Sequence, residues 1–180
     1  MAGEAFCQAY AASYGMTACA LRFANVYGPF SLHKKSVVAA WLRAVLAGEP
    51  LRINGDGEQT RDFIYVEDIA RGVLAALDAP HGAVSGEVFQ VGTGRETGIN
   101  ELAAAVGRAT GRTVETRHGP ALAGDVRRNV SRIDKAADRL GFRASVGIDD
   151  GLGRTAEWWK NAVEDRRLAG VTPHQASGSE

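Results

Sequence analysis

The stretch from Asn54 to Ala70 contains the side chain best placed in this sequence to bind an anion. A tight glycine turn precedes Arg61, and a short apolar run, Phe63–Val66, follows it as an expected strand. An arginine at the mouth of a strand can donate two parallel hydrogen bonds to phosphate oxygens. From the residues alone, a surface ion pair of Arg61 with Asp62 or Glu58 is an equally good interpretation.

A second stretch, Gly92–Gly98, looks like a dinucleotide-binding turn, in which glycines let the backbone approach a pyrophosphate at the start of a helix. It follows an expected strand, and Glu115 stands about twenty residues further on, as such a motif requires. The third glycine, however, comes one residue late. We therefore interpret the stretch as a glycine-rich turn from strand to helix, with Thr97 as the expected N-cap.

The sequence shows no pattern of catalytic or metal-binding residues. No tyrosine has a lysine four residues later, and no serine, histidine and aspartate can be assigned to a nucleophilic constellation. The histidines show no metal-ligand spacing with each other or with the cysteines; they are His33, His81, His118 and His174. Asp68 is expected to cap a helix rather than to act as an acid.

Hydrophobic periodicity and turn residues predict alternating helices and strands, and therefore an α/β fold. The expected helices cover residues 2–14, 37–47, 68–79, 99–110, 134–140 and 151–168, with Ser36 as N-cap of the second. The expected strands cover residues 17–26, 51–54, 63–66, 88–91 and 113–116. The last residues, 169–180, have the composition of a disordered tail.

Composition excludes some classes of protein and favours others. The 180 residues are 45% apolar and 23% charged, which is typical of a globular domain, and 21 basic residues balance 21 acidic ones. A zero net charge argues against a nucleic-acid partner. No apolar run is long enough to span a membrane, and no signal pattern is present, so we expect a cytoplasmic protein. The two cysteines, Cys7 and Cys19, are expected to be small core residues in a reducing compartment.

Three stretches resemble motifs of the extended short-chain dehydrogenase/reductase family, the NAD-dependent sugar-nucleotide epimerases and dehydratases. They are Leu21-Arg22-Phe23-Ala24-Asn25-Val26-Tyr27-Gly28-Pro29, the stretch Asn54–Ala70, and Ala121-Leu122-Ala123-Gly124-Asp125-Val126. The family also has a strand and turn similar to Gln90–Gly94 far from its cofactor glycines, with Asn at the first position. The resemblance spans about residues 1–165 and is strongest to the UDP-glucose 4-epimerases.

The resemblance assigns roles to individual residues. It implies that Asn25 and Arg61 contact the diphosphate of a nucleotide sugar and that Asp125 bonds ribose hydroxyls. The residues themselves leave Asn25 the alternative of bonding its own turn, and Asp125 that of capping its loop. The free backbone N–H groups of Ser36 and Val37, at the start of a helix, could also meet phosphate.

One position departs from the family pattern. The family has an arginine three residues before the aspartate of the third stretch, whereas this chain has Leu122. One phosphate contact is therefore lost or supplied by another residue, for which Arg127 is a candidate.

The resemblance also implies how the chain is organised. Residues 1–30 would be a remnant of the NAD-binding Rossmann domain, with part of its parallel sheet. Residues 31–168 would be mainly the small α/β substrate-binding domain, with some returning Rossmann elements. The catalytic Tyr and Lys of the family stand just before a helix resembling Ala2–Phe6, so that place falls at Met1 or upstream of it. The chain is therefore expected to be a C-terminal portion that is inactive alone.

The activity implied is that of an NAD-dependent nucleotide-sugar epimerase, in which NAD takes a hydride from the sugar and returns it to the other face. A UDP-hexose is the expected substrate, and a homodimer is expected for the full-length enzyme. NAD binding by this chain is doubtful, because it lacks the cofactor's glycine motif. The alternatives are a dehydratase, decarboxylase or reductase of the same family, or a non-catalytic nucleotide-sugar-binding module.

Overall fold

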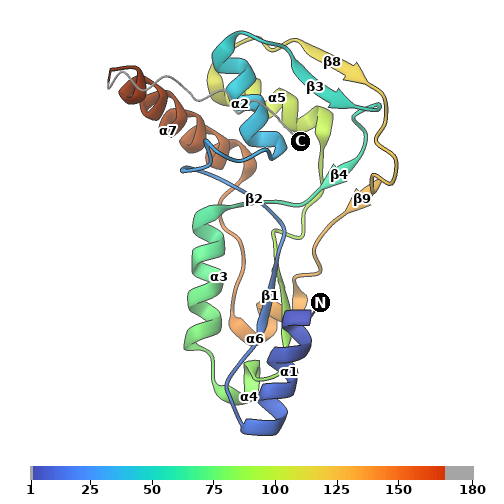
Figure 1. Cartoon of the computed structure of the whole chain (residues 1–180), viewed down its shortest axis with the longest axis vertical. Helices are drawn as coiled ribbons and strands as arrows, with labels where there is room; N and C mark the ends of the chain where they lie inside the picture. The colour runs from blue at the N-terminus through green and yellow to red at the C-terminus, as the bar shows by residue number, and fades with distance from the viewer. Residues whose placement is uncertain (1, 169–180) are drawn as a thin grey trace, which may run out of the picture.

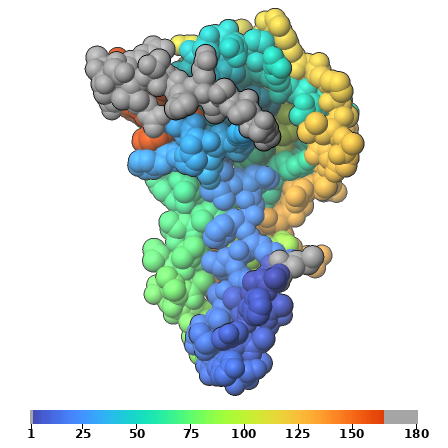
Figure 2. Space-filling model, in the orientation of Figure 1, coloured from blue at the N-terminus to red at the C-terminus, as the bar shows by residue number. Residues whose placement is uncertain are grey.

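The chain runs several times between two lobes, which a narrower middle joins (Figure 1). The structure is a computed structural model that describes residues 2–168. The upper lobe in Figure 1 holds α2 (Val37–Ala47), β3 (Leu51–Asn54), α5 (Ile99–Thr110), β8 (Thr116–Gly119) and α7 (Ile148–Leu168). The lower lobe holds α1 (Ala2–Tyr14), β1 (Ala20–Phe23), α3 (Val66–Asp78), α4 (His81–Val84), β6 (Val88–Val91) and α6 (Asp134–Leu140). Figure 2 shows the lower lobe as the narrower of the two.

Short strands cross the middle of the molecule. They are β2 (Asn25–Tyr27), β4 (Thr60–Arg61), β5 (Phe63–Tyr65), β7 (Thr97–Gly98) and β9 (Arg128–Asn129). The pairs β1–β6, β2–β5 and β3–β8 are parallel, while β4 pairs in parallel with β9 and antiparallel with β7. Parallel pairing through crossovers is what the predicted alternation of helices and strands requires.

The single strand predicted over residues 17–26 is wrong, because the chain changes partner within it. The N–H of Ala24 donates to Val91 in the lower lobe, at 3.0 Å. The next N–H, that of Asn25, donates to Asp62 in the middle of the molecule, at 2.9 Å. Two short strands, β1 and β2, therefore replace one long strand, and the chain passes from one lobe to the other at this point.

Each lobe has its own apolar core, which explains why both form. Much of the upper core comes from α2, β3, α5 and α7, and it includes Trp41, Leu42, Leu51, Leu102 and Trp159. The lower core is built mainly from the middle of the sequence and from α6, and it includes Ile64, Phe89, Val91, Ala136 and Phe142. The helix predicted over residues 37–47 is confirmed, and its buried side chains include Val38, Trp41, Leu42 and Val45.

Several element boundaries differ from the predicted ones. The strand predicted at 113–116 lies instead at Thr116–Gly119, because its parallel register with β3 pairs Leu51 with Thr116 and Asn54 with Gly119. Helix α3 begins at Val66 and helix α7 at Ile148, earlier than predicted. The short helix α4 and the two-residue strands β4, β7 and β9 carry too little periodicity to predict. The predicted tail lies outside the described residues.

The sequence predicts both cysteines in the core, but only one packs there. Cys7 and Cys19 are free thiols and both are partly buried; Cys19 packs against the lower core as predicted, whereas Cys7 lies on α1, which has no buried residue. Burial raises the pKa of the Cys19 thiol. Among the described residues, no helix combines the length and the apolar character that crossing a membrane requires.

Candidate functional site

Arg61 is held by three acceptors rather than lying free on the surface. Its Nη1 donates to the carbonyls of Thr60, at 2.7 Å, and Val126, and its Nη2 pairs with the carboxylate of Asp125. The Arg61 side chain keeps 17% of its surface exposed. The ion pairs with Asp62 or Glu58 that the sequence left open are therefore wrong, and Asp125 is the partner.

The arrangement leaves Arg61 with donors for a ligand. A guanidinium has five N–H groups, and three of them are used by the acceptors just described. Among the described residues, the Nε–H and the second Nη2–H of Arg61 have no partner. Because the protein already fixes the plane of the guanidinium, a ligand that meets these two donors loses little side-chain entropy on binding.

Asp125 reaches Arg61 from the loop that precedes β9. Its backbone N–H donates to the carbonyl of Leu122 at 3.2 Å, and the loop turns at Gly124, which has a φ of 77°. Leu122 itself is exposed. Asp125 thus orients Arg61, and its second carboxylate oxygen makes no hydrogen bond within the described residues.

Asn25 lies at the start of β2, where the chain leaves the lower lobe. Its side-chain Nδ2 donates to the carbonyl of Asp62 at 3.1 Å, so the alternative that it bonds its own turn is wrong. Asn25 lines a small cavity of about 190 Å³, together with Phe23, Gln90 and Ser131. The cavity lies at the carboxyl ends of β1 and β6, which is where parallel α/β sheets usually bind their ligands.

The start of α2 has unused backbone donors. Ser36 is the N-cap, as predicted, but its hydroxyl makes no capping hydrogen bond. The N–H groups of the first helical turn, beginning with Val37, therefore have no partner within the helix. Figure 1 shows this end of α2 on the side of the upper lobe nearest β2. Three of the predicted site residues are connected: Asn25 bonds the carbonyl of Asp62, the residue after Arg61, and Arg61 pairs with Asp125. No hydrogen bond within the described residues connects Ser36 or Val37 to these three.

Arg127, the candidate replacement for the missing family arginine, is engaged elsewhere. Its Nη1 contacts both carboxylate oxygens of Asp56, at 2.7 and 2.8 Å. Both side chains are largely exposed. An exposed pair of this kind contributes little to stability, so it does not prevent Arg127 from turning toward a ligand.

Asp62 is a buried acidic residue beside Arg61 whose surroundings the sequence does not predict. Its side chain is 2% exposed, and its carboxylate accepts hydrogen bonds from Thr93, Gly94 and Ser131. The sequence indicates Asp62 only as a surface partner of Arg61. The signal that could have found it is an acidic residue placed directly before an apolar strand, where a buried carboxylate must be satisfied by hydrogen bonds.

The prediction that Asp68 caps a helix is wrong in its geometry. Asp68 lies in the third position of α3, and the N-cap is Tyr65. The buried carboxylate of Asp68 instead accepts from the backbone N–H groups of Ser145 and Val146, at 3.1 and 3.0 Å, and pairs with Arg71. It ties α3 to the segment that leads into α7, which is a structural role.

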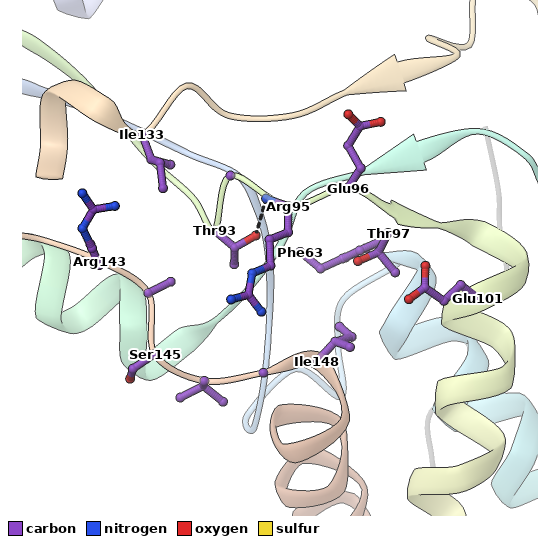
Figure 3. A pocket seen from close by; sticks show the side chains of 14 residues that line it. Phe63, Thr93, Arg95, Glu96, Thr97, Glu101, Ile133, Arg143, Ser145 and Ile148 are labelled. Atoms are coloured by element: carbon purple, nitrogen blue, oxygen red, sulfur yellow. Dashed lines mark hydrogen bonds between the residues drawn. The ribbon is translucent and has the colours of Figure 1, made fainter.

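A larger cavity, of about 530 Å³, lies between the turn at Thr93–Thr97 and the segment 143–148 (Figure 3). Arg95 extends into the open space in Figure 3, while Glu101 approaches from α5. None of the five predicted site residues lines this cavity. The N-cap of α5 is Gly98 rather than the predicted Thr97, because Thr97 pairs with Arg61 in the β4–β7 ladder.

The described residues contain no group of three or more His, Cys, Asp or Glu side chains that could hold a metal ion. The Gly92–Gly98 turn does not offer the N–H groups of Thr93 and Gly94 freely to the pyrophosphate of NAD. It follows β6 and opens α5 by way of β7, but these two N–H groups already donate to the Asp62 carboxylate. The interpretation of this stretch as a turn rather than a cofactor fingerprint agrees with that geometry.

A comparison with known proteins identifies the family. The model of the NAD dependent epimerase/dehydratase family matches residues 1–92. The chain belongs to this family. A UDP-glucose 4-epimerase of Mycolicibacterium smegmatis is 37% identical over 165 residues, which cover 89% of this chain and 51% of the relative. A UDP-N-acetyl-alpha-D-glucosaminuronate decarboxylase of Bacillus cytotoxicus is 28% identical over 170 residues.

Solved structures agree with the fold. The UDP-glucose 4-epimerase of Thermotoga maritima, solved with UDP-glucose, superposes with a TM-score of 0.83 at 35% identity, covering 90% of this chain and 52% of that one. A UDP-glucuronic acid 4-epimerase of Bacillus cereus, solved with UDP-glucuronic acid and NAD, gives 0.79 at 28% identity and covers 89% and 50%. The α/β fold with parallel strands is thus that of the extended epimerases, and the chain spans about half the length of the relatives it matches.

Proposed function

We propose that this chain is the nucleotide-sugar-binding part of an NAD-dependent epimerase similar to UDP-glucose 4-epimerase. The observation that carries the proposal is Arg61, which is fixed by three acceptors and keeps two donors for a ligand, while Asn25 bonds the carbonyl of the following residue, Asp62. The diphosphate of a nucleotide sugar offers charged oxygens to both side chains. The relatives solved with UDP-glucose and UDP-glucuronic acid support this choice of ligand.

Each predicted site residue has a role in this proposal. Arg61 and Asn25 bind the diphosphate, and the start of α2, at Ser36 and Val37, offers backbone N–H groups to it. Asp125 has one carboxylate oxygen on Arg61, and its other oxygen accepts from a ribose hydroxyl. The diphosphate therefore binds in the middle of the molecule, where the strands of the two lobes meet.

The proposal extends to the organisation of the enzyme. This chain corresponds to the C-terminal half of the relatives, with residues 1–30 from the NAD-binding domain and residues 31–168 mainly from the substrate domain. NAD and the catalytic Tyr and Lys belong to the other half, which supplies the chemistry of the reaction. A homodimer and a cytoplasmic location are part of the same proposal, and the free thiols of Cys7 and Cys19 support a reducing compartment.

The test is a pair of calorimetric titrations on the 180-residue chain, one with UDP-glucose and one with NAD. We expect UDP-glucose to bind and NAD not to bind, and we expect no conversion of UDP-glucose to UDP-galactose when NAD is added. Turnover by the chain alone would contradict the proposed division of roles. Binding of NAD without UDP-glucose would contradict the proposed ligand.

A second candidate is a decarboxylase or dehydratase of the same family. The relative from Bacillus cytotoxicus supports it, although at lower identity than the epimerase relatives. The two candidates share the nucleotide-sugar site and differ in the reaction. The mass of the product that the full-length enzyme forms from UDP-glucose or UDP-glucuronic acid discriminates them, because an epimerase leaves the mass of the nucleotide sugar unchanged, whereas a dehydratase removes water and a decarboxylase removes carbon dioxide.

A further inference from the structure

Asp62 connects parts of the chain that are far apart in the sequence. One carboxylate oxygen accepts from the N–H and the hydroxyl of Thr93, at 3.0 and 2.6 Å. The other accepts from the N–H groups of Gly94 and Ser131, at 3.1 and 3.2 Å. The backbone carbonyl of the same residue accepts the N–H and the side-chain amide of Asn25. Four segments therefore meet at one buried residue.

The turn needs glycine at two positions in order to surround this carboxylate. A methyl group at Gly92 would overlap Oδ2 of Asp62 and Oγ of Ser131, so only glycine allows the approach. Gly94 has a φ of 69°, a left-handed conformation that lets successive N–H groups point to the same side. The turn is thus an anion-binding nest of the kind that glycine-rich phosphate loops form, and the anion in it is the side chain of Asp62.

The backbone of Asp62 adjoins residues of the proposed diphosphate site. Asn25 bonds the carbonyl of Asp62, Arg61 is the residue before Asp62, and Ser131, which the carboxylate binds, follows β9, the strand that pairs with β4. Resting on the proposed function, we propose that Asp62 is a positioning residue for diphosphate binding, acting as an internal anion that fills the nest. It contacts no ligand itself, and it sets where Asn25 and Arg61 present their donors.

The experiment compares Asp62→Asn with Asp68→Asn. Both carboxylates are buried and both accept backbone N–H groups, but Asp68 ties α3 to the segment at Ser145, which contains no proposed diphosphate contact. An amide in place of the Asp62 carboxylate would set its NH₂ group against backbone donors. The dissociation constants of UDP and of uridine are measured for each chain by NMR titration.

We expect Asp62→Asn to weaken UDP about tenfold while changing uridine less than about twofold, since only the diphosphate contacts are displaced. Asp68→Asn should leave the ratio of the affinities for UDP and uridine unchanged, even if it lowers the melting temperature as much as Asp62→Asn does. The proposal is overturned if the two variants change that ratio alike, or if Asp62→Asn leaves it unchanged.

A second measurement, made on the unsubstituted chain, tests the nest even if a variant does not fold or if the chain does not bind UDP. In the unsubstituted chain, the amides of Thr93, Gly94 and Ser131, which donate to the buried carboxylate, should exchange with solvent at least tenfold more slowly than the neighbouring amide of Arg95, an exposed residue that donates only to the Thr93 hydroxyl. Fast exchange at all three would overturn the nest even if UDP binds. If the chain does not bind UDP at all, the proposed function fails, and Asp62 then has no ligand site to position.

Discussion

At the scale of single residues, Arg61 and Arg127 differ in how they are partnered. Both pair with an aspartate, Arg61 with Asp125 and Arg127 with Asp56. Arg61 is mostly buried and is also held by two backbone carbonyls, whereas Arg127 is exposed and bonds Asp56 alone. The first is preorganised for a ligand and the second is not, which makes Arg127 a matched control.

We predict that Arg61→Ala lowers the affinity of the chain for UDP-glucose by about 2–4 kcal/mol, because it removes a charged donor of two hydrogen bonds. Arg127→Ala should change the affinity by less than about 0.5 kcal/mol. Isothermal titration of both variants checks this. Normal binding by Arg61→Ala together with weak binding by Arg127→Ala would place the diphosphate near Asp56 instead.

Leu122 offers a gain-of-function test at the same scale. It is exposed beside the Arg61–Asp125 pair, at the position where the family has an arginine. We predict that Leu122→Arg tightens UDP-glucose binding several-fold, or about 1 kcal/mol, by adding a second cation near the diphosphate. Leu74→Arg, at an almost equally exposed leucine on α3, should have no effect. Equal tightening by both would indicate only a general effect of charge.

At the scale of elements, the short strands of the middle depend on side-chain ties. Glu96 precedes β7 and accepts from the Arg128 side chain of β9, at 2.7 Å, and from the hydroxyl of Thr60 in β4, at 2.9 Å. A two-residue strand has few backbone hydrogen bonds of its own, so this carboxylate helps to hold β7, β4 and β9 together. The bond from Arg128, followed by that from Thr60, lowers the pKa of Glu96 below its ordinary 4.5.

Because the pKa of Glu96 is lowered, the stability that its hydrogen bonds to Arg128 and Thr60 contribute depends on pH. The carboxylate form is favoured in the folded chain, so its stabilisation is fully present above about pH 4.5 and is lost as the pH falls through the lower folded pKa. We predict that Glu96→Gln destabilises the chain at pH 7 and that its difference from the unsubstituted chain shrinks below pH 4.5. Urea unfolding across this range measures it. Glu157→Gln, on the exposed face of α7, should show no such convergence, and a difference for Glu96→Gln that persists unchanged at low pH would contradict the role of the tie.

The sequence predicted long elements better than the site that they carry. The helices over 2–14 and 99–110 and the strands over 51–54 and 88–91 follow from periodicity and are confirmed. The resemblance pointed to Arg61 and Asp125, but their pairing could not be predicted, because it joins residues 64 positions apart. The roles of Asp62 and Asp68 were missed for the same reason, since their partners lie far along the chain.

At the scale of the whole molecule, the rest of the described chain covers little of the first helix. No residue of α1 is buried, and its aromatic side chains Phe6, Tyr10 and Tyr14 are 64%, 48% and 73% exposed. Strand β1, against which α1 lies, pairs only with β6 among the described strands. An open strand edge and exposed aromatic side chains together favour association with another chain.

We therefore predict that the isolated chain self-associates and that its first thirty residues are less protected than the Phe63–Tyr65 strand. Sedimentation should show a species larger than a monomer, and Phe6→Asp with Tyr10→Asp should reduce it. Leu74→Asp with Leu77→Asp, on the exposed face of α3, should not. A monomer whose residues 1–30 exchange as slowly as Phe63–Tyr65 would instead indicate a self-sufficient domain.

The most direct test of the central claim is the position of a bound nucleotide. We propose a crystal structure of this chain grown with UDP-glucose. We expect the diphosphate to lie against the Nε and Nη2 of Arg61, within hydrogen-bond reach of Asn25. We expect the Asp62 carboxylate to keep its hydrogen bonds to the turn at Thr93 and Gly94. A diphosphate bound in the Gly92–Gly98 turn, with Asp62 displaced from it, would contradict the account.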